Sequence, residues 1–167
     1  MIKPISDPLV SIRHYLRPWD VGYITYLHSI LYAPEQGWDH TFDAYVAIPL
    51  AEFAKAHSSR ERIWILEKEK RIVGSIAIVK HSDMEAQLRW LLLDPQLRGQ
   101  GLGRRLLREA LDFCRDVGYS FVFLWTVDTL PMATKLYQSV GFKKTQEVTH
   151  EMWGSVVTEV RYDLALK

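Results

Sequence analysis

Residues 88–103 read LRWLLLDPQLRGQGLG, and this stretch decides the fold. The near-continuous apolar run at 90–93 is typical of a strand that is buried on both faces. Asp94-Pro95 then ends the strand, because proline has no N–H to donate to a β-ladder. From 102 to 117, apolar residues recur at helical spacing. The stretch therefore predicts a central strand that a glycine-rich loop joins to an amphipathic helix.

The loop Arg98-Gly-Gln-Gly-Leu-Gly103 has features of an anion-binding site. Glycines lack Cβ atoms and adopt backbone angles that let successive N–H groups converge on an anion. The start of the next helix adds unpaired N–H groups and the positive end of the helix dipole. The spacing Arg-x-x-Gly-x-Gly matches neither the dinucleotide fingerprint nor the Gly-Lys-Ser/Thr of nucleoside triphosphate loops. A plain glycine-rich turn is the favoured interpretation of the loop alone, but its place between strand and helix favours an anion site.

Further strands and helices are expected on both sides of this stretch. The strands are expected at 10–16, 63–66, 72–79, 88–93, 120–127, 145–153 and 156–166, the last two meeting at Gly154-Ser155. The helices are expected from an N-cap at Asp20 to about Tyr32, over 42–54 and 102–117, and from a cap at Asp128 or Thr129 to Gly141, with a turn at 33–37. We expect an α/β (α+β) fold in a single domain over residues 1–167. Its sheet is mixed but mostly antiparallel, with six or seven strands and about four flanking helices.

Composition excludes several classes of function. The formal net charge of +1 gives no global attraction to nucleic acid, and no apolar stretch is long enough to cross a membrane. The single cysteine, Cys114, cannot form an internal disulfide and is most simply a small core residue. No Cys/His spacing suggests a metal site, and the N-terminal ten residues show no secretory signal. We expect a soluble, cytoplasmic protein.

At these residues the chain resembles the GCN5-related N-acetyltransferase (GNAT) superfamily, whose Arg/Gln-x-x-Gly-x-Gly/Ala loop follows the fourth strand. Leu136-Tyr137 and Gly141-Phe142 are similar to a second family signature, near the last major helix. Within the superfamily, LYAPEQGWDHTFDAYV, LRWLLLDPQLRGQGLG and HEMWGSVVTEVRYDL look like acetyltransferase domains fused to MarR-type regulators. The resemblance covers nearly the whole chain and implies a sheet that splays between the strand ending at Leu93 and the strand at 120–127.

The resemblance also implies a cofactor, acetyl-CoA, and the residues that bind it. The backbone of Leu91 and Leu93 would hold the pantetheine arm. The phosphates would lie on the loop, formed by Arg98, Gly99, Gln100, Gly101, Leu102, Gly103 and Arg104. Many relatives place an asparagine where this chain has Leu130, so that contact is expected to be missing or supplied by another group.

The same resemblance assigns chemistry to two of these positions. The Leu93 N–H would face the thioester oxygen, where a fixed donor stabilises the developing oxyanion by about 3 kcal/mol. Tyr137 would protonate the departing thiolate. Tyr137 also belongs to an apolar helical stripe, so the pattern alone favours simple core packing, and the resemblance favours catalysis.

The general base is assigned less directly. Glu85 is the first choice, because related enzymes often carry a carboxylate at the start of this strand, although a solvated glutamate is an equal alternative. Gln87 stands at a position that is often acidic in the family, and an amide cannot act as a base. The reserve candidates are His28, Glu35 and Asp39.

The function implied is direct transfer of an acetyl group from acetyl-CoA to a primary amine of a small molecule or peptide. The alternative is a coenzyme A-binding sensor without turnover. Tyr32, Trp38 and Trp125 are candidates to line the acceptor site, although large aromatics are more often core residues. The acceptor itself is left open, and the closing strands and six tryptophans leave room for a homodimer.

Overall fold

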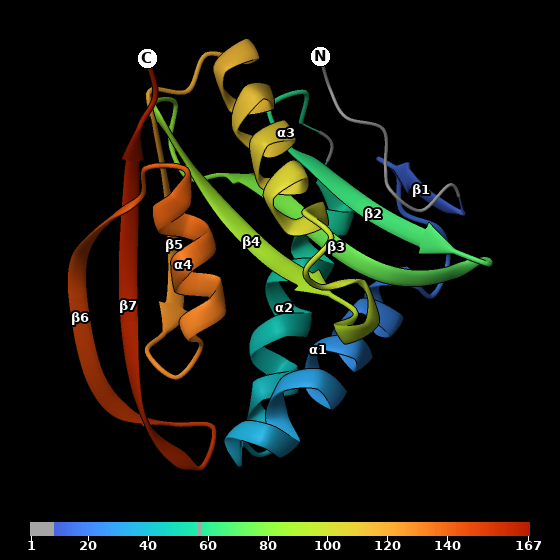
Figure 1. Ribbon diagram of the computed structural model, residues 1–167, viewed down its shortest axis with the longest axis vertical. Helices are drawn as coiled ribbons and strands as arrows, with labels where there is room; N and C mark the ends of the chain where they lie inside the picture. Colours follow the sequence, from blue (N-terminus) through green and yellow to red (C-terminus); the bar gives the residue numbers. More distant parts are fainter. Residues whose placement is uncertain (1–8, 57) are drawn as a thin grey trace.

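The computed structural model describes residues 9–56 and 58–167 and contains one seven-stranded sheet of order β1-β2-β3-β4-β5-β7-β6 (Figure 1). The N-terminal residues in which no secretory signal is expected therefore lie almost wholly outside the described part. The strands are β1 (Val10–Arg13), β2 (Arg62–Lys68), β3 (Arg71–Lys80), β4 (Glu85–Leu93), β5 (Phe121–Val127), β6 (Lys143–Met152) and β7 (Ser155–Ala165). The helices are α1 (Asp20–Gln36), α2 (Thr41–Lys55), α3 (Leu102–Asp116) and α4 (Pro131–Ser139), with a 3₁₀ turn at Pro95–Leu97. The expected α/β (α+β) class, strand number and helix number are confirmed.

The sheet is covered on both faces. Figure 1 shows α3 and α4 on one face, with α1 and α2 on the other. A core cluster that includes Leu106, Leu107 and Leu111 of α3 fills the first face, and a second cluster around Leu50 fills the opposite one. This double cover explains why the central strands read as continuous apolar runs and not as an alternating pattern.

The sheet splays at its centre, as expected. Every neighbouring pair of strands is antiparallel except β4 and β5, which run parallel and pair only over Glu85–Gln87 and Phe121–Phe123. Beyond this short ladder the two strands separate toward the carboxyl end of β4. The separation leaves the backbone groups of β4 near Leu93 without a strand partner on that side.

A bulge bends β4 within its splayed part. The register with β3 shifts between Ser75 and Ala77, and Trp90 adopts a left-handed φ of 52°. The buried Ser75 hydroxyl donates to the Trp90 carbonyl oxygen at 2.7 Å, which holds the bulge in place. Because a bulge places two residues opposite one, it changes which face of the sheet the following side chains reach.

Three local details differ from the sequence-based expectations. Helix α1 continues through the predicted turn and through Pro34, and ends at Gly37, whose φ of 73° caps it. Asp20 is the first residue of α1 and not its cap, because its carboxylate is buried and bonds the Arg13 guanidinium at 2.6 Å. Helix α4 begins at Pro131 without a side-chain cap, so neither Asp128 nor Thr129 serves that role.

Candidate functional site

The glycine loop forms an open cradle at the start of α3. Gly99 and Gly101 have φ values of 77° and 81°, and Gly101 is the N-cap of the helix. A Cβ atom at either position would have no neighbour within 4 Å, so side chains would occupy the space above the loop. The Arg98 side chain donates to the Leu93 carbonyl oxygen at 3.3 Å, which ties the loop to the end of β4. The residues fit a phosphate group, because open N–H groups and a helix start face the same space.

A cavity of about 580 Å³ occupies the splay. We call the part next to the loop the loop side, which is lined by Leu91, Leu93, Arg98, Gly99, Gly101, Leu102, Gly103, Arg104, Ala133, Leu136 and Tyr137. We call the part against α1 and α2 the aromatic side, which is lined by His28, Tyr32, Glu35, Trp38, Phe42, Tyr45, Gln87, Arg89, Trp90, Trp125, Trp153 and Glu159. The cavity therefore joins an anion cradle to a second, mostly aromatic compartment.

The end of β4 presents free backbone groups to this cavity. The Asp94 N–H donates to the Val73 carbonyl at 2.8 Å, and Leu93 stands opposite Gly74 in the same antiparallel ladder. Because bonded and non-bonded pairs alternate in such a ladder, the N–H and C=O of Leu93 point away from β3 and into the splay. The Tyr32 hydroxyl donates to the Leu91 carbonyl at 3.4 Å, at the junction of the two sides.

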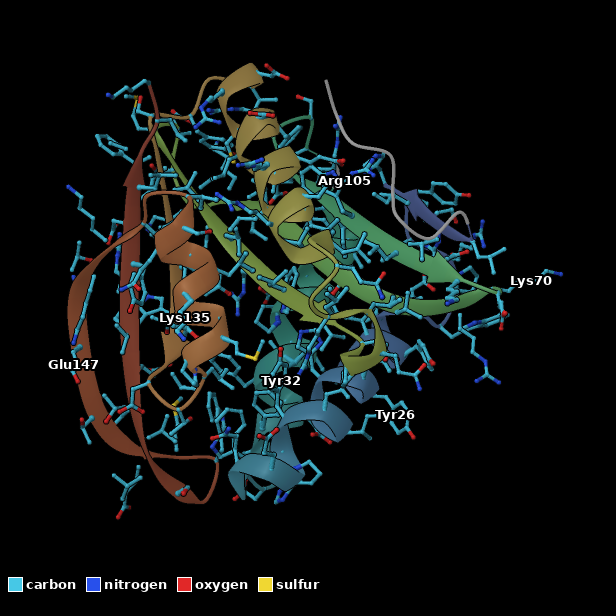
Figure 2. All side chains as sticks on the ribbon, in the orientation of Figure 1. Tyr26, Tyr32, Lys70, Arg105, Lys135 and Glu147 are labelled. Atoms are coloured by element: carbon cyan, nitrogen blue, oxygen red, sulfur yellow. The ribbon has the colours of Figure 1, made fainter. Side chains whose placement is uncertain are left out.

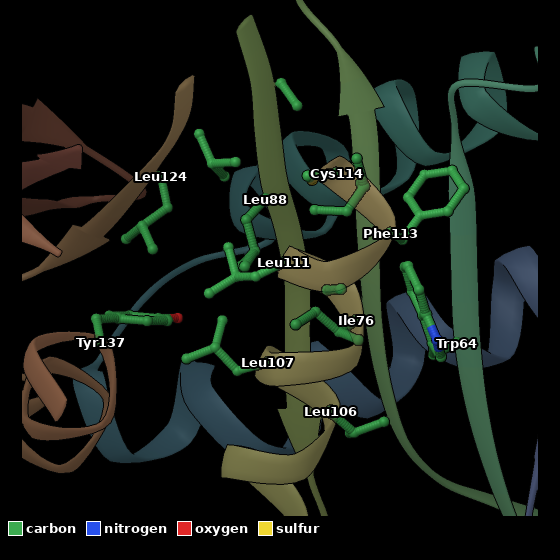
Figure 3. Packing of buried hydrophobic residues seen from close by; sticks show 14 of the residues in the cluster. Trp64, Ile76, Leu88, Leu106, Leu107, Leu111, Phe113, Cys114, Leu124 and Tyr137 are labelled. Carbon is green, nitrogen blue, oxygen red and sulfur yellow. The ribbon is translucent and has the colours of Figure 1, made fainter. Parts of the chain in front are cut away.

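Tyr137 combines core packing with access to the cavity. Its ring lies 6.0 Å from that of Phe142 and 6.4 Å from that of Tyr162, and the residue is 6% exposed. Figure 3 shows its hydroxyl pointing from α4 toward α3. Burial, with a smaller contribution from the Tyr32 phenol, raises the pKa of Tyr137, so the hydroxyl keeps its proton at neutral and moderately alkaline pH.

Several predicted site residues are not brought to the cavity. Glu85 does not line it, because its carboxylate pairs with Arg161 at 2.8 Å at the end of β4 that is still bonded to β5. Gln100 turns back to the Gln96 carbonyl, at 3.4 Å. Asp39 instead caps Thr41, and its own N–H donates to the Trp153 carbonyl at 2.8 Å. A base that acts directly on a ligand must therefore come from another residue.

Two of the three reserve candidates, His28 and Glu35, line the cavity, and His28 is the buried one. Its Nδ1 lies 2.8 Å from the Ile24 carbonyl oxygen, so Nδ1 carries the proton and the lone pair is on Nε2. Its ring is 6.1 Å from that of Tyr32, one helical turn further along α1. Burial lowers the pKa of His28 to about 4, so the imidazole is neutral at pH 7.

The lowered pKa of His28 predicts a loss of stability in mild acid. The folded state prefers the neutral ring, so His28 contributes its full stability above the unfolded pKa of about 6.5 and loses it as pH falls toward 4. Between pH 7.5 and pH 5, we expect wild type to lose about 2 kcal/mol more unfolding free energy than His28→Gln. Urea titrations of both proteins at the two pH values measure this difference. Equal pH dependence of the two proteins would contradict the burial of a neutral imidazole.

The aromatic side contains residues that the sequence did not single out. The rings of Trp38, Phe42 and Tyr45 surround Trp153 with centroid distances of 4.5, 5.0 and 4.9 Å. Among the sequence candidates, His28, Tyr32, Glu35, Trp38, Trp125 and Leu130 all line the cavity. Arg89, Trp153 and Glu159 were missed. Strand periodicity could have placed Arg89 beside Gln87, but no local pattern shows that the turn after β6 folds onto α2.

The basic residues at the start of α3 divide between the cavity and the far side of the helix. Arg98 and Arg104 line the cavity. Figure 2 shows Arg105 on the side of α3 that faces β2, where its Nε donates to Glu109 at 3.0 Å, whereas Tyr32 lies by the end of β4.

Over residues 9–56 and 58–167, no group of three or more His, Cys, Asp or Glu side chains could hold a metal ion. No helix in that part of the chain is long and apolar enough to cross a membrane.

Comparisons with known proteins agree with this architecture. A profile described as the acetyltransferase (GNAT) family matches residues 17–142. Human N-acetyltransferase 8B is 30% identical over 141 residues, which are 80% of this chain and 62% of that protein, so the chain spans less than two thirds of this relative. The crystal structure of an acetyltransferase from Streptococcus agalactiae has a TM-score of 0.79 at 20% identity, over 96% of this chain and 100% of that one. The structure of yncA from Salmonella typhimurium with its cofactor acetyl-CoA has a TM-score of 0.68 at 18% identity, over 95% of each chain.

Proposed function

The chain belongs to the acetyltransferase (GNAT) family, and on that premise we propose that it transfers an acetyl group from acetyl-CoA to a primary amine of a small molecule or peptide. The observation that carries the proposal is the single cavity that joins the glycine cradle to the aromatic side at the splay. A phosphate-bearing donor can lie at one end while an acceptor enters from the other. The human relative named as an N-acetyltransferase supports the same reaction.

The loop side is proposed to hold acetyl-CoA. Backbone N–H groups of 99–104 and the start of α3 face the phosphates, and the backbone of Leu91 and Leu93, which has no strand partner on the splayed side, runs along the pantetheine arm. Gln100, expected to take part through its side chain, contributes only its backbone to this proposal. The bound molecule supplies an acetyl thioester. The neighbour yncA, which shares the fold and was solved with acetyl-CoA, supports this use of the loop.

Two groups of this chain are proposed to assist the transfer. The Leu93 N–H donates to the carbonyl oxygen under attack, because it faces the splay without a strand partner. The Tyr137 hydroxyl gives its proton to the sulfur as the thiol leaves, and its raised pKa keeps that proton available. Neither group has to move far, since one is fixed by the β-ladder and the other by packing.

His28 replaces Glu85 as the residue proposed to receive the acceptor amine. Its Nε2 lone pair accepts a hydrogen bond from the amine and orients it, while solvent at the cavity mouth takes the proton. With a pKa of about 4, His28 is suited to accept a hydrogen bond from the amine and not to remove its proton. Glu85 stays a prediction from the family resemblance, and its ion pair with Arg161 offers it no direct approach to the acceptor.

Acetyl-CoA-dependent release of thiol tests the proposal. Purified protein is mixed with acetyl-CoA and a panel of amines, thiol is detected with a chromogenic disulfide, and acetylated amine is identified by mass spectrometry. Cys114 adds little background, because it is buried and its thiol pKa is raised to about 12. We expect release that depends on an amine. Tight binding of acetyl-CoA without turnover on any amine would instead favour the alternative of a coenzyme A-binding sensor.

Three finer expectations stay predictions of the sequence. They are the likeness to acetyltransferase domains fused to MarR-type regulators, the cytoplasmic location and the homodimer. The single buried cysteine is compatible with a reducing compartment. Strand β6 is an edge strand exposed along almost its whole length, which is compatible with pairing between copies of the chain.

A further inference from the structure

Arg89 is a cation on the aromatic side that the proposed reaction does not use. Its guanidinium lies 5.1 Å from the Trp90 ring centroid and 6.0 Å from that of Tyr45. Within residues 9–56 and 58–167, its guanidinium forms no side-chain hydrogen bond and no ion pair, although the residue lines the cavity. Burial lowers the pKa of Arg89, and the Tyr45 phenol and the charge of Glu52 only partly offset that effect. The side chain is therefore a partly buried charge without a counter-ion.

Two other partly buried arginines that stack on aromatic rings have partners, whereas Arg62, which also stacks, is exposed to solvent. Arg161 stacks over Phe123 at 4.1 Å but also pairs with Glu85 and Asp163, each at 2.8 Å. Arg60 stacks over Tyr119 at 4.1 Å and donates to the Asp83 carbonyl at 2.9 Å. Arg89 is half-buried at the cavity wall and has lost part of its hydration, so an anion that enters the cavity can supply the counter-charge that the described residues do not.

The chemistry of that partner follows from the surroundings. The forked guanidinium donors match the two oxygens of a carboxylate, and a charge-assisted pair is strongest where water is excluded. The phosphate cradle lies on the loop side, so Arg89 is left for a different anion. The rings of Tyr45 and Trp90 lie beside the guanidinium, and Tyr45 packs on Trp153, so the wall of the cavity next to Arg89 is aromatic.

We propose that Arg89 binds the carboxylate of the acceptor, and that the acceptor is a primary amine carrying a carboxylate and an apolar side chain, as in a hydrophobic α-amino acid. This inference rests on the proposed acetyl transfer and specifies its substrate class. Arg89 stands two residues before Leu91 on β4, at most about 7 Å along the strand. An amine adjacent to a carboxylate bound there would share the cavity with His28 and with the end of β4.

Matched pairs of acceptors test the inference. L-Phenylalanine is compared with 2-phenylethylamine, and L-leucine with 3-methylbutylamine, by kcat/KM for thiol release. We expect wild type to prefer the carboxylated member of each pair by at least about tenfold. Arg89→Gln is expected to lose that preference, and Arg89→Lys to keep part of it, because a lysine retains the charge but not the fork. Arg62→Gln is the control, since Arg62 stacks over Phe113 at 4.4 Å and does not line the cavity.

Each outcome separates the inference from the proposed function. Equal use of both members of each pair by wild type, or an unchanged preference in folded Arg89→Gln, would overturn the inference and leave acetyl transfer standing. Turnover with other amines but with none of these four would overturn it as well. Failure of wild type to bind acetyl-CoA in calorimetry would overturn the proposed function itself. Circular dichroism of each variant distinguishes loss of recognition from loss of fold.

Discussion

Replacing Gly103 with tryptophan is expected to lower the affinity for acetyl-CoA by at least about 100-fold, because the indole would fill the loop side of the cavity. Gly103 lines the cavity, and a Cβ atom there would already lie 3.4 Å from a methyl carbon of Leu136. The larger side chain can only extend into the space proposed for the phosphates and the pantetheine arm. A loss of about 100-fold corresponds to about 2.7 kcal/mol of binding free energy. Isothermal titration of acetyl-CoA measures it.

Gly103 is a sharper position for this test than Gly101. Gly101 has a left-handed φ of 81°, so any substitution there adds backbone strain to the steric effect, whereas Gly103 has no positive φ. Gly22→Trp is the matched control, since Gly22 also lies in the first turn of a helix, has open space around it and does not line the cavity. Retained binding in a folded Gly103→Trp variant would remove the loop from the cofactor site.

The sequence predicted the fold well wherever one local pattern dominated. The apolar run at 90–93 indicated a doubly covered strand, and β4 does have helices over both faces. Predictions of local structure were wrong where tertiary contacts overrode a local sequence signal. Pro34 suggested a turn, yet packing of α1 against α2 carries the helix on to Gly37. Asp20 suggested a cap, but its carboxylate neutralises the buried Arg13.

The candidate site was predictable on the loop side and not on the aromatic side. Most of the loop side, from Leu91 to Arg104, is one contiguous stretch whose Arg-x-x-Gly-x-Gly spacing indicates an anion site, and Tyr137 belongs to a second short signature. The aromatic side combines α1, α2, β4, β5 and the turn after β6, and only folding brings them together. Ordinary strand alternation puts Arg89 on the same face as Gln87, but nothing in β4 alone shows that α1, α2 and the turn after β6 close a cavity over that face.

Tyr137→Phe is expected to lower kcat by about 100-fold or more while leaving the affinity for acetyl-CoA unchanged. The substitution removes only the hydroxyl, so the ring contacts with Phe142 and Tyr162 remain and the fold should persist. General acids typically contribute 100-fold to 10,000-fold in rate. Because the pKa of Tyr137 is raised, the hydroxyl stays protonated as pH increases, and the deficit of the variant should be as large at pH 9 as at pH 7. Thiol-release kinetics at both pH values measure the effect.

A second tyrosine supplies the control that separates proton donation from packing. Tyr119 is 4% exposed, close to the 6% of Tyr137, and its pKa is also raised, to about 12. Its hydroxyl donates to the Arg60 carbonyl at 2.9 Å, and it does not line the cavity. Tyr119→Phe should therefore cost about 1 kcal/mol of stability and leave kcat unchanged. If Tyr137→Phe behaves in the same way, then Tyr137 serves only the core, and the proton for the leaving thiol must come from water or from the Tyr32 phenol at the junction of the two sides.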